Sequence, residues 1–284
     1  MNKQRAFTPL EIRIYNTRIF NRGSKRFLTG FTLIELLVVI AVIALLMAIL
    51  TPALAHVRKQ AKAVACQSVL SQWGKIFIVY TMHNDGYFAS GSSGEMWTTT
   101  LEPFYREPEL RLCPMATQLA APGGSPAPWG GKFLAWGAFD STYAMLGLEG
   151  VYGSYGMNGH VSNPAPHVKV DPWGRNTKRN WRSPDVKGAA NIPLFLDCTY
   201  LGGLPESHDQ PPQYDGDCQY GLSGPGMKAF CIDRHNGYIN GLFVDFSVRE
   251  IGLKELWKLK WHREFDTNAA TPIWPEWMKN FKDF

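Results

Sequence analysis

The sequence lacks the short motifs by which most enzymes are recognised. It contains no Gly-x-x-x-x-Gly-Lys phosphate loop, no dinucleotide fingerprint, no Gly-x-Ser-x-Gly nucleophile turn and no Cys-x-x-Cys zinc spacing. Serine, histidine and aspartate are present, but no signature places them together. No internal repeat is evident either. We therefore predict that the chain is not an enzyme.

Excess positive charge is missing from most of the chain. The formal net charge is +5, but residues 1–30 alone carry seven Lys and Arg against the single acid Glu11. Residues 31–284 hold 22 basic and 23 acidic side chains, a net charge of −1. A nucleic-acid surface needs clustered positive charge on the folded body. We therefore expect no nucleic-acid partner.

One long apolar run organises the sequence. Fifteen apolar residues follow one another from Leu36 to Leu50. With its apolar flanks the span reaches about 25 residues, enough for a helix to cross a hydrocarbon core of about 30 Å. Positive charge ahead of the run keeps that end in the cytoplasm and sends the rest across the membrane. One carboxylate, Glu35, lies inside the span, where it is costly unless it has a partner.

Residues 30–35, Gly-Phe-Thr-Leu-Ile-Glu, directly precede this apolar run. They resemble the cleavage and methylation motif of type IV prepilins and type II secretion pseudopilins. A secretory signal peptide would have a shorter apolar core and a small-residue cleavage site after it, whereas Gly30 precedes the run. The alternative interpretation is a plain, uncleaved signal anchor.

The resemblance implies a role for four residues. In that family a membrane peptidase cuts after the glycine and methylates the new N-terminal phenylalanine, which implies cleavage between Gly30 and Phe31 and N-methylation of Phe31. It also implies that Glu35 pairs with the N-terminal amine of a neighbouring subunit during assembly. Pro52 matches the helix-interrupting proline of such stems, and we expect it to bend or loosen the helix.

The sequence beyond Pro52 is amphipathic and predicts that the helix continues to about Met82. Its apolar residues recur at steps of three and four: Leu54, Val57, Ala61, Val64, Ala65, Val69, Leu70, Trp73, Ile76, Phe77 and Tyr80. The turn signal Asn84-Asp85-Gly86 ends the helix. We expect the upper part of the stem to pack on a globular head.

Two segments predict strands in the head. In residues 238–251 two apolar runs, 242–244 and 248–251, flank a polar centre at Asp245, which indicates an antiparallel hairpin. Residues 191–197 indicate a second, buried strand. The predicted fold is α+β and pilin-like, with a long N-terminal helix packed on an antiparallel sheet. The predicted parts are a basic leader at 1–30, a transmembrane and stem helix at 31–82, and an extracytoplasmic head at 83–284.

The spacing of His235 and Asp245, with nine residues between them, resembles the His-X9-Asp-Gly feature of one branch of prepilin-type proteins. The glycine of that feature is Phe246 here. Because Phe does not easily adopt the positive φ of the tightest hairpin turns, we expect a wider or shifted turn. The two residues could form a metal or acid–base pair. We favour the alternative that His235 hydrogen-bonds the hairpin turn and fixes the strand register.

The cysteines all lie on the translocated side, where the compartment is oxidising. Cys66 with Cys113 would tie the stem to the head, and Cys218 with Cys231 would close a loop. Both pairings are hypotheses, and reduced buried thiols are the alternative. Cys198 is the fifth cysteine, and this odd number leaves one thiol free or in an intermolecular bond.

Two further groups have candidate binding roles. Asp215 and Asp217 could hold Ca²⁺, since spaced carboxylates suit a hard cation, but their spacing fits no EF-hand loop and we expect no cofactor. Four tryptophans near the C-terminus could form a contact patch for carbohydrate or protein, or else core packed by a short helix over residues 253–263. These are Trp257, Trp261, Trp274 and Trp277.

These features predict a pilin-like or pseudopilin subunit with no catalytic activity. A prepilin peptidase would process it in the inner membrane, with the N-terminus cytoplasmic, the helix in lipid and the head periplasmic. Inner-membrane machinery would then assemble it with other pilin or pseudopilin subunits into a type IV pilus, a type II secretion-like filament or a DNA-uptake fibre. The competing interpretation is a membrane-anchored periplasmic binding protein that uses the helix only as a tether.

Overall fold

The computed structural model describes residues 32–91, 96–119, 127–137, 139, 147–171, 175–217 and 226–284. The predicted leader at 1–30 lies outside these residues. The chain forms two compact units, of which the first ends at Thr51 and the second begins at Pro52.

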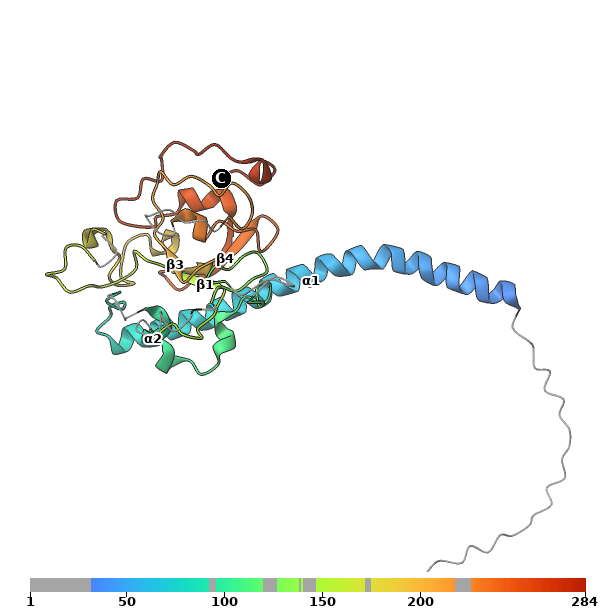
Figure 1. The fold of residues 1–284 in the computed structure, drawn as a ribbon, viewed down its shortest axis with the longest axis horizontal. Helices are drawn as coiled ribbons and strands as arrows, with labels where there is room; N and C mark the ends of the chain where they lie inside the picture. Colours follow the sequence, from blue (N-terminus) through green and yellow to red (C-terminus); the bar gives the residue numbers. More distant parts are fainter. Residues whose placement is uncertain are drawn as a thin grey trace, which may run out of the picture. The chain divides into compact units, whose positions relative to one another are not determined.

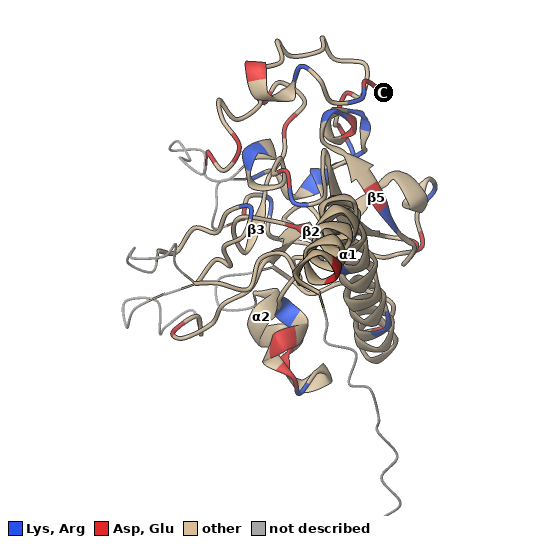
Figure 2. Cartoon of the chain, turned by 90° about the vertical axis from the view of Figure 1, so that its right-hand side faces the viewer, with Lys and Arg blue, Asp and Glu red and all other residues tan. Residues whose placement is uncertain are grey.

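A single long helix begins near the N-terminus. Helix α1 (Leu33–His83, 51 residues) matches the helix predicted for residues 31–82 and is assigned without a break through Pro52. In the first unit the large apolar side chains from Leu33 to Leu50 expose 45–79% of their surface. By length and composition this helix could cross a membrane. Figure 2 shows α1 with few charged residues over this part.

The second unit contains the rest of α1, up to the predicted turn. Asp85 and Gly86 both have positive φ, 50° and 81°. The Gly86 N–H donates to the Thr81 carbonyl at 2.8 Å, which satisfies one of the last helical acceptors. Asn84 completes the cap, because its side-chain amide donates to the carbonyl of Tyr87 at 2.9 Å. The predicted end of the helix is confirmed.

Within the described residues, five strands form one mixed sheet in the order β3-β1-β2-β4-β5. Figure 1 labels β1, β3 and β4 in this sheet. The pairs β1–β2, β2–β4 and β4–β5 are antiparallel, whereas the short β3 joins β1 in parallel. The α+β fold is therefore confirmed, with the correction that the sheet is not wholly antiparallel. The strands are β1 (Tyr155–Asn158), β2 (Pro193–Asp197), β3 (Gly202–Gly203), β4 (Tyr238–Phe243) and β5 (Val248–Gly252).

The remaining helical elements are short. The helix expected over residues 253–263 is a six-residue 3₁₀ segment, η7, whose first turn Glu255 caps by accepting the Gly252 N–H at 3.1 Å. These short elements are α2 (Trp97–Thr100), η1 (Glu102–Phe104), η2 (Pro108–Arg111), η4 (Thr177–Arg179), η5 (Ala189–Asn191), η6 (Met227–Ala229), η7 (Leu253–Lys258) and η8 (Glu276–Met278).

The sheet lies between two apolar layers. Side chains alternate along a strand, so Phe195 and Leu242 face the cluster that contains the α1 stem residues. Their neighbours Leu196 and Phe243 belong to a second cluster, built with the C-terminal segment. Figure 1 shows α1 on one side of β1 and β4 and the C-terminal segment on the other.

The stem presents a narrow apolar face to the sheet. Trp73 is fully buried, and its ring centroid lies 4.9 Å from that of Phe195. The predicted stripe is correct from Val69 upward but shifted below it, because Val64 is 64% exposed while Cys66 is buried. The buried stem residues are Ala63, Cys66, Leu70, Trp73, Gly74, Ile76, Phe77 and Thr81.

Strands β4 and β5 form the predicted hairpin, but its turn differs from the expectation. Phe246 adopts a φ of 65°. Its N–H donates to the Phe243 carbonyl at 2.9 Å, so the turn stays tight. Left-handed geometry costs an L-residue about 1–2 kcal/mol. The Phe246 ring packs against the stem-side core, which offsets this cost and explains why the expected widening does not occur.

Candidate functional site

The Glu35 carboxylate is hydrogen-bonded to Thr32, the residue directly before helix α1. One of its oxygens accepts the Thr32 N–H at 2.9 Å and the Thr32 hydroxyl at 2.7 Å, and the Glu35 N–H points back to that hydroxyl at 3.3 Å. This reciprocal pattern is a capping box, which the Thr-x-x-Glu spacing could have indicated. The predicted cleavage residues Gly30 and Phe31 lie outside the described residues.

In the head, His235 pairs with a residue that its sequence neighbourhood does not indicate. Its Nε2 lies 3.2 Å from Oδ2 of Asp197, the last residue of β2, and 3.6 Å from the Cys113 sulfur. Asp245 lies beyond the other end of β4, in the hairpin turn, where it accepts the Ser247 hydroxyl at 2.6 Å. The structure therefore supports neither a His235–Asp245 pair nor a histidine bonded to the hairpin turn.

Asp197 is a fully buried carboxylate that is held ionised. Its Oδ1 accepts from Arg234 at 3.0 Å and its Oδ2 accepts the Asn240 N–H at 2.9 Å. Burial alone would raise the pKa of Asp197, but His235, Arg234 and this N–H together hold it well below its usual value. Arg234 is also fully buried, and its two Nη groups donate to the carbonyls of Gly131, Ser154 and Cys198.

Two thiols complete this buried cluster. Cys66 from α1 and Cys113 lie with Asp197 and His235 so that one ligand atom from each falls within 4.8 Å of all the others. The Tyr155 hydroxyl donates to the Cys66 sulfur at 3.2 Å. Burial raises the pKa of Cys66, whereas at Cys113 hydrogen bonds from Cys66 and His235 outweigh burial and lower the pKa to about 7.

The structure thus brings one predicted cysteine pair together. Cys66 and Cys113 are neighbours, but both are free thiols, so the bond between them stays a prediction. Cys218 lies outside the described residues. Cys231 is a buried free thiol beside the Met278 sulfur at 3.9 Å. Cys198 is also free and buried, which raises its pKa to about 12.

A second group combines the buried His160 and His262 with the half-buried Glu206. His262 Nδ1 accepts the Glu264 N–H at 3.2 Å, so its Nε2 carries the proton that points at Glu206, 3.2 Å away. His160 is 1% exposed and its ring nitrogens have no hydrogen-bond partner among the described residues. Burial lowers the pKa of His160 to about 3, which keeps the ring neutral.

The carboxylates considered for Ca²⁺ face lysines instead. Asp215 lies 3.3 Å from Lys132, and Asp217 lies 2.9 Å from Lys228. Asp209 accepts two backbone N–H groups, from Glu206 at 3.0 Å and Met227 at 2.8 Å. In the described residues Lys and Arg are interspersed with Asp and Glu over the head (Figure 2). The Ca²⁺ hypothesis gains no support from this arrangement.

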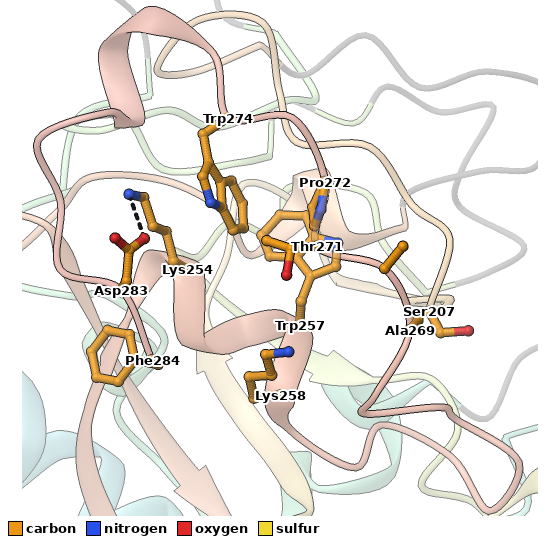
Figure 3. A pocket seen from close by; sticks show the side chains of 11 residues that line it. Ser207, Lys254, Trp257, Lys258, Ala269, Thr271, Pro272, Trp274, Asp283 and Phe284 are labelled. Atoms are coloured by element: carbon orange, nitrogen blue, oxygen red, sulfur yellow. Dashed lines mark hydrogen bonds and ion pairs between the residues drawn. The ribbon is translucent and has the colours of Figure 1, made fainter.

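The tryptophans near the C-terminus divide between core and surface. Trp261 is fully buried and Trp257 is 5% exposed, as the core interpretation expects. Trp257 also meets Trp274 edge-on, with ring centroids 5.2 Å apart, in the wall of a pocket of about 200 Å³ (Figure 3). Lys254 and Asp283 form a 2.8 Å ion pair at its edge. This volume is below the range of about 300–1,000 Å³ usual for small-molecule sites.

Comparison with known proteins bears on the N-terminal part of the chain. Residues 29–51 match the family described as the prokaryotic N-terminal methylation motif. This match covers the predicted cleavage residues and the exposed apolar half of α1. The chain has a prepilin-type N-terminus.

A curated relative is also similar to part of the chain. The type IV wide pilus major component PilA4 of Thermus thermophilus is 45% identical to this chain over 58 residues. The matched segment is 20% of this chain and 44% of the relative. No solved structure matches the chain.

The buried cluster around Asp197 and His235 includes three residues that the sequence analysis did not single out. Asp197, Arg234 and Tyr155 come from β2, the segment before β4, and β1. An acid at the end of an otherwise apolar strand, as in Pro193–Asp197, is the one signal that could have indicated a buried, partnered carboxylate.

Proposed function

We propose that this protein is a pilin-like or pseudopilin subunit of a type IV pilus or type II secretion-like filament. The observation that carries the proposal is the coincidence of the methylation motif at residues 29–51 with an exposed apolar helix. A prepilin peptidase cuts between Gly30 and Phe31 and methylates Phe31. The subunit then waits in the inner membrane with its head in the periplasm, until the assembly machinery adds it to a filament of pilin subunits.

The exposed apolar side chains of α1 are the surface by which subunits associate. Between Leu33 and Leu50 the chain itself leaves these side chains exposed, so they need a membrane or another subunit to cover them. Exposed apolar patches larger than a few hundred Å² mark interaction sites or membrane contact. Packing such helices against one another in a filament core removes this surface from lipid and water alike.

Glu35 sets the axial register of the filament. In the single chain its carboxylate is already bonded to Thr32, but it keeps its charge and further lone pairs. The amine of a neighbouring Phe31 supplies the counter-charge, which stabilises a carboxylate in an apolar surrounding. The capping role of Glu35 and its charge are separable, because glutamine also closes a capping box.

The test is filament yield in the native host for three variants. Glu35→Ala and Glu35→Gln should be cleaved normally, as judged by intact mass, yet form few or no filaments. Thr32→Ala, the matched control, weakens the helix cap by about 1 kcal/mol but keeps the charge, and should still assemble. Wild-type filament yield from Glu35→Gln would contradict the proposed pairing. If the wild-type chain itself stays in the membrane and never enters filaments, the helix is a tether and the alternative of an anchored binding protein is correct.

A further inference from the structure

We propose that Cys66, Cys113, Asp197 and His235 form a structural Zn²⁺ site that fastens the stem helix to the head. Their four ligand atoms lie within 4.8 Å of one another and all four residues are buried. They come from four places: α1, the segment after η2, the end of β2, and the segment before β4. The site is independent of filament assembly.

Three of the six distances between the ligand atoms fit one tetrahedral zinc ion, and all six are within 4.8 Å. Bonds of about 2.3 Å to sulfur and about 2.1 Å to nitrogen and oxygen imply separations of about 3.6 Å for sulfur–nitrogen, 3.6 Å for sulfur–oxygen and 3.4 Å for nitrogen–oxygen. The structure has 3.6 Å from Cys113 Sγ to His235 Nε2. It has 3.7 Å from Cys66 Sγ to Asp197 Oδ2, and 3.2 Å from His235 Nε2 to that same oxygen.

The surroundings of Asp197 and Cys66 suit a bound metal. Ligating carboxylates are usually held by hydrogen bonds of their own, and Asp197 receives Arg234 and the Asn240 N–H. The Tyr155 hydroxyl donates to the Cys66 sulfur, which favours the thiolate. Two thiolates balance the charge of Zn²⁺, and Arg234 balances Asp197. The loaded site is therefore electrically neutral, as a buried site must nearly be.

The donor set selects the kind of metal. Two thiolates, one imidazole and one carboxylate are ligands that favour Zn²⁺ over Mg²⁺ or Ca²⁺, which prefer oxygen. Four protein ligands leave no open coordination position, so the ion would be structural and not catalytic. On binding, each thiol loses its proton to solvent. The Nε2 proton that His235 directs at Asp197 must also leave that nitrogen, so that His235 binds as the neutral imidazole. No electron transfer is involved.

The group of His160, Glu206 and His262 does not fit a metal in the same way. His262 already accepts a backbone N–H at Nδ1, so its Nε2 must carry a proton and cannot also coordinate. Of these two groups within the described residues, the cysteine cluster is the one that fits a bound metal.

The experiment measures metal and thiols in the full-length protein, purified in detergent from its host's membranes without reductant or chelator. Elemental analysis should give about one zinc per chain, and alkylation after denaturation should find Cys66 and Cys113 free. Cys66→Ser and Cys113→Ser should lose the zinc. Cys231→Ser, which removes a buried thiol outside the cluster, should retain it. Equal loss in Cys231→Ser would overturn the assignment.

A second measurement does not depend on the variants folding. The wild-type chain, stripped of metal under reducing conditions, is titrated with Co²⁺ and then with Zn²⁺. Thiolate-to-cobalt charge-transfer absorption should appear at about one equivalent and vanish when zinc displaces the cobalt. Zinc should also raise the unfolding temperature of the head. A Cys66–Cys113 disulfide in the purified chain, or the absence of the cobalt absorption, would refute the site.

Discussion

Trp73 of the stem helix and Phe195 of the central strand β2 lie with their ring centroids 4.9 Å apart, and both side chains are fully buried. The indole Nε1 of Trp73 also donates to the Leu110 carbonyl at 2.6 Å. These contacts of Trp73 join the helix α1, the sheet and the short helix η2. They make the upper half of α1 part of the head's core.

Trp73→Ala should therefore lower the free energy of unfolding of the head by about 3–5 kcal/mol, the range for a truncated core aromatic. Urea unfolding of the full chain in detergent, followed by tryptophan fluorescence, measures it. Met82→Ala on the same helix is the control, because Met82 is 77% exposed and should change stability by no more than about 0.5 kcal/mol. A loss below about 1 kcal/mol for Trp73→Ala would show that the stem is not part of the core.

The left-handed residue of the β4–β5 turn gives a paired test. Phe246→Ala and Phe246→Gly both remove the ring, and they differ only in the Cβ atom. At a φ of 65° the glycine variant should be the more stable by about 1 kcal/mol, because a Cβ is strained in that conformation. Urea midpoints of the two variants decide the question. Equal stability would mean that residue 246 does not hold this conformation in solution.

His160 should make the head sensitive to acid. Burial, with help from His262 and Arg175, lowers its pKa from 6.5 to about 3 in the folded chain. As the pH falls below 6.5, the unfolded chain therefore binds the proton first. Stability is complete above that pH and is lost progressively toward pH 3. Between pH 7 and pH 5 this one group should lower the free energy of unfolding by about 2 kcal/mol.

His160→Met removes this titration and keeps an apolar side chain of similar volume. Between pH 7 and pH 5 the free energy of unfolding of the variant should fall by about 2 kcal/mol less than that of wild type, as measured by urea unfolding at both pH values. His56→Gln, which changes an exposed histidine on α1, serves as the control and should follow the wild-type curve. Identical pH dependence of His160→Met and wild type would show that the buried ring is not the acid-sensitive group.

Local patterns were enough to predict the elements that depend on neighbours in sequence. The apolar run and its amphipathic continuation predicted α1 to within two residues at its start and one at its end. Two apolar runs that flank Asp245 predicted the hairpin, and the Asn84-Asp85-Gly86 signal predicted the helix end. Each of these depends on residues that lie only a few positions apart, so the sequence itself displays the pattern.

The buried cluster could not be predicted in the same way. Asp197 meets His235 because β2 pairs with β4, and Cys66 meets both because α1 packs on that sheet. These contacts depend on strand order, which no local pattern reports. Phe246 was misjudged for a related reason, since core packing outweighs its backbone preference. The fold class was thus readable from the sequence, whereas the partner of His235 was not.

The most direct test of the central proposal is the intact mass and N-terminal sequence of the protein from its native host's membranes. Prepilin processing predicts a chain that begins at Phe31 and carries one additional methyl group. A chain that retains residues 1–30 would contradict the account, because the motif at residues 29–51 would then act only as an anchor.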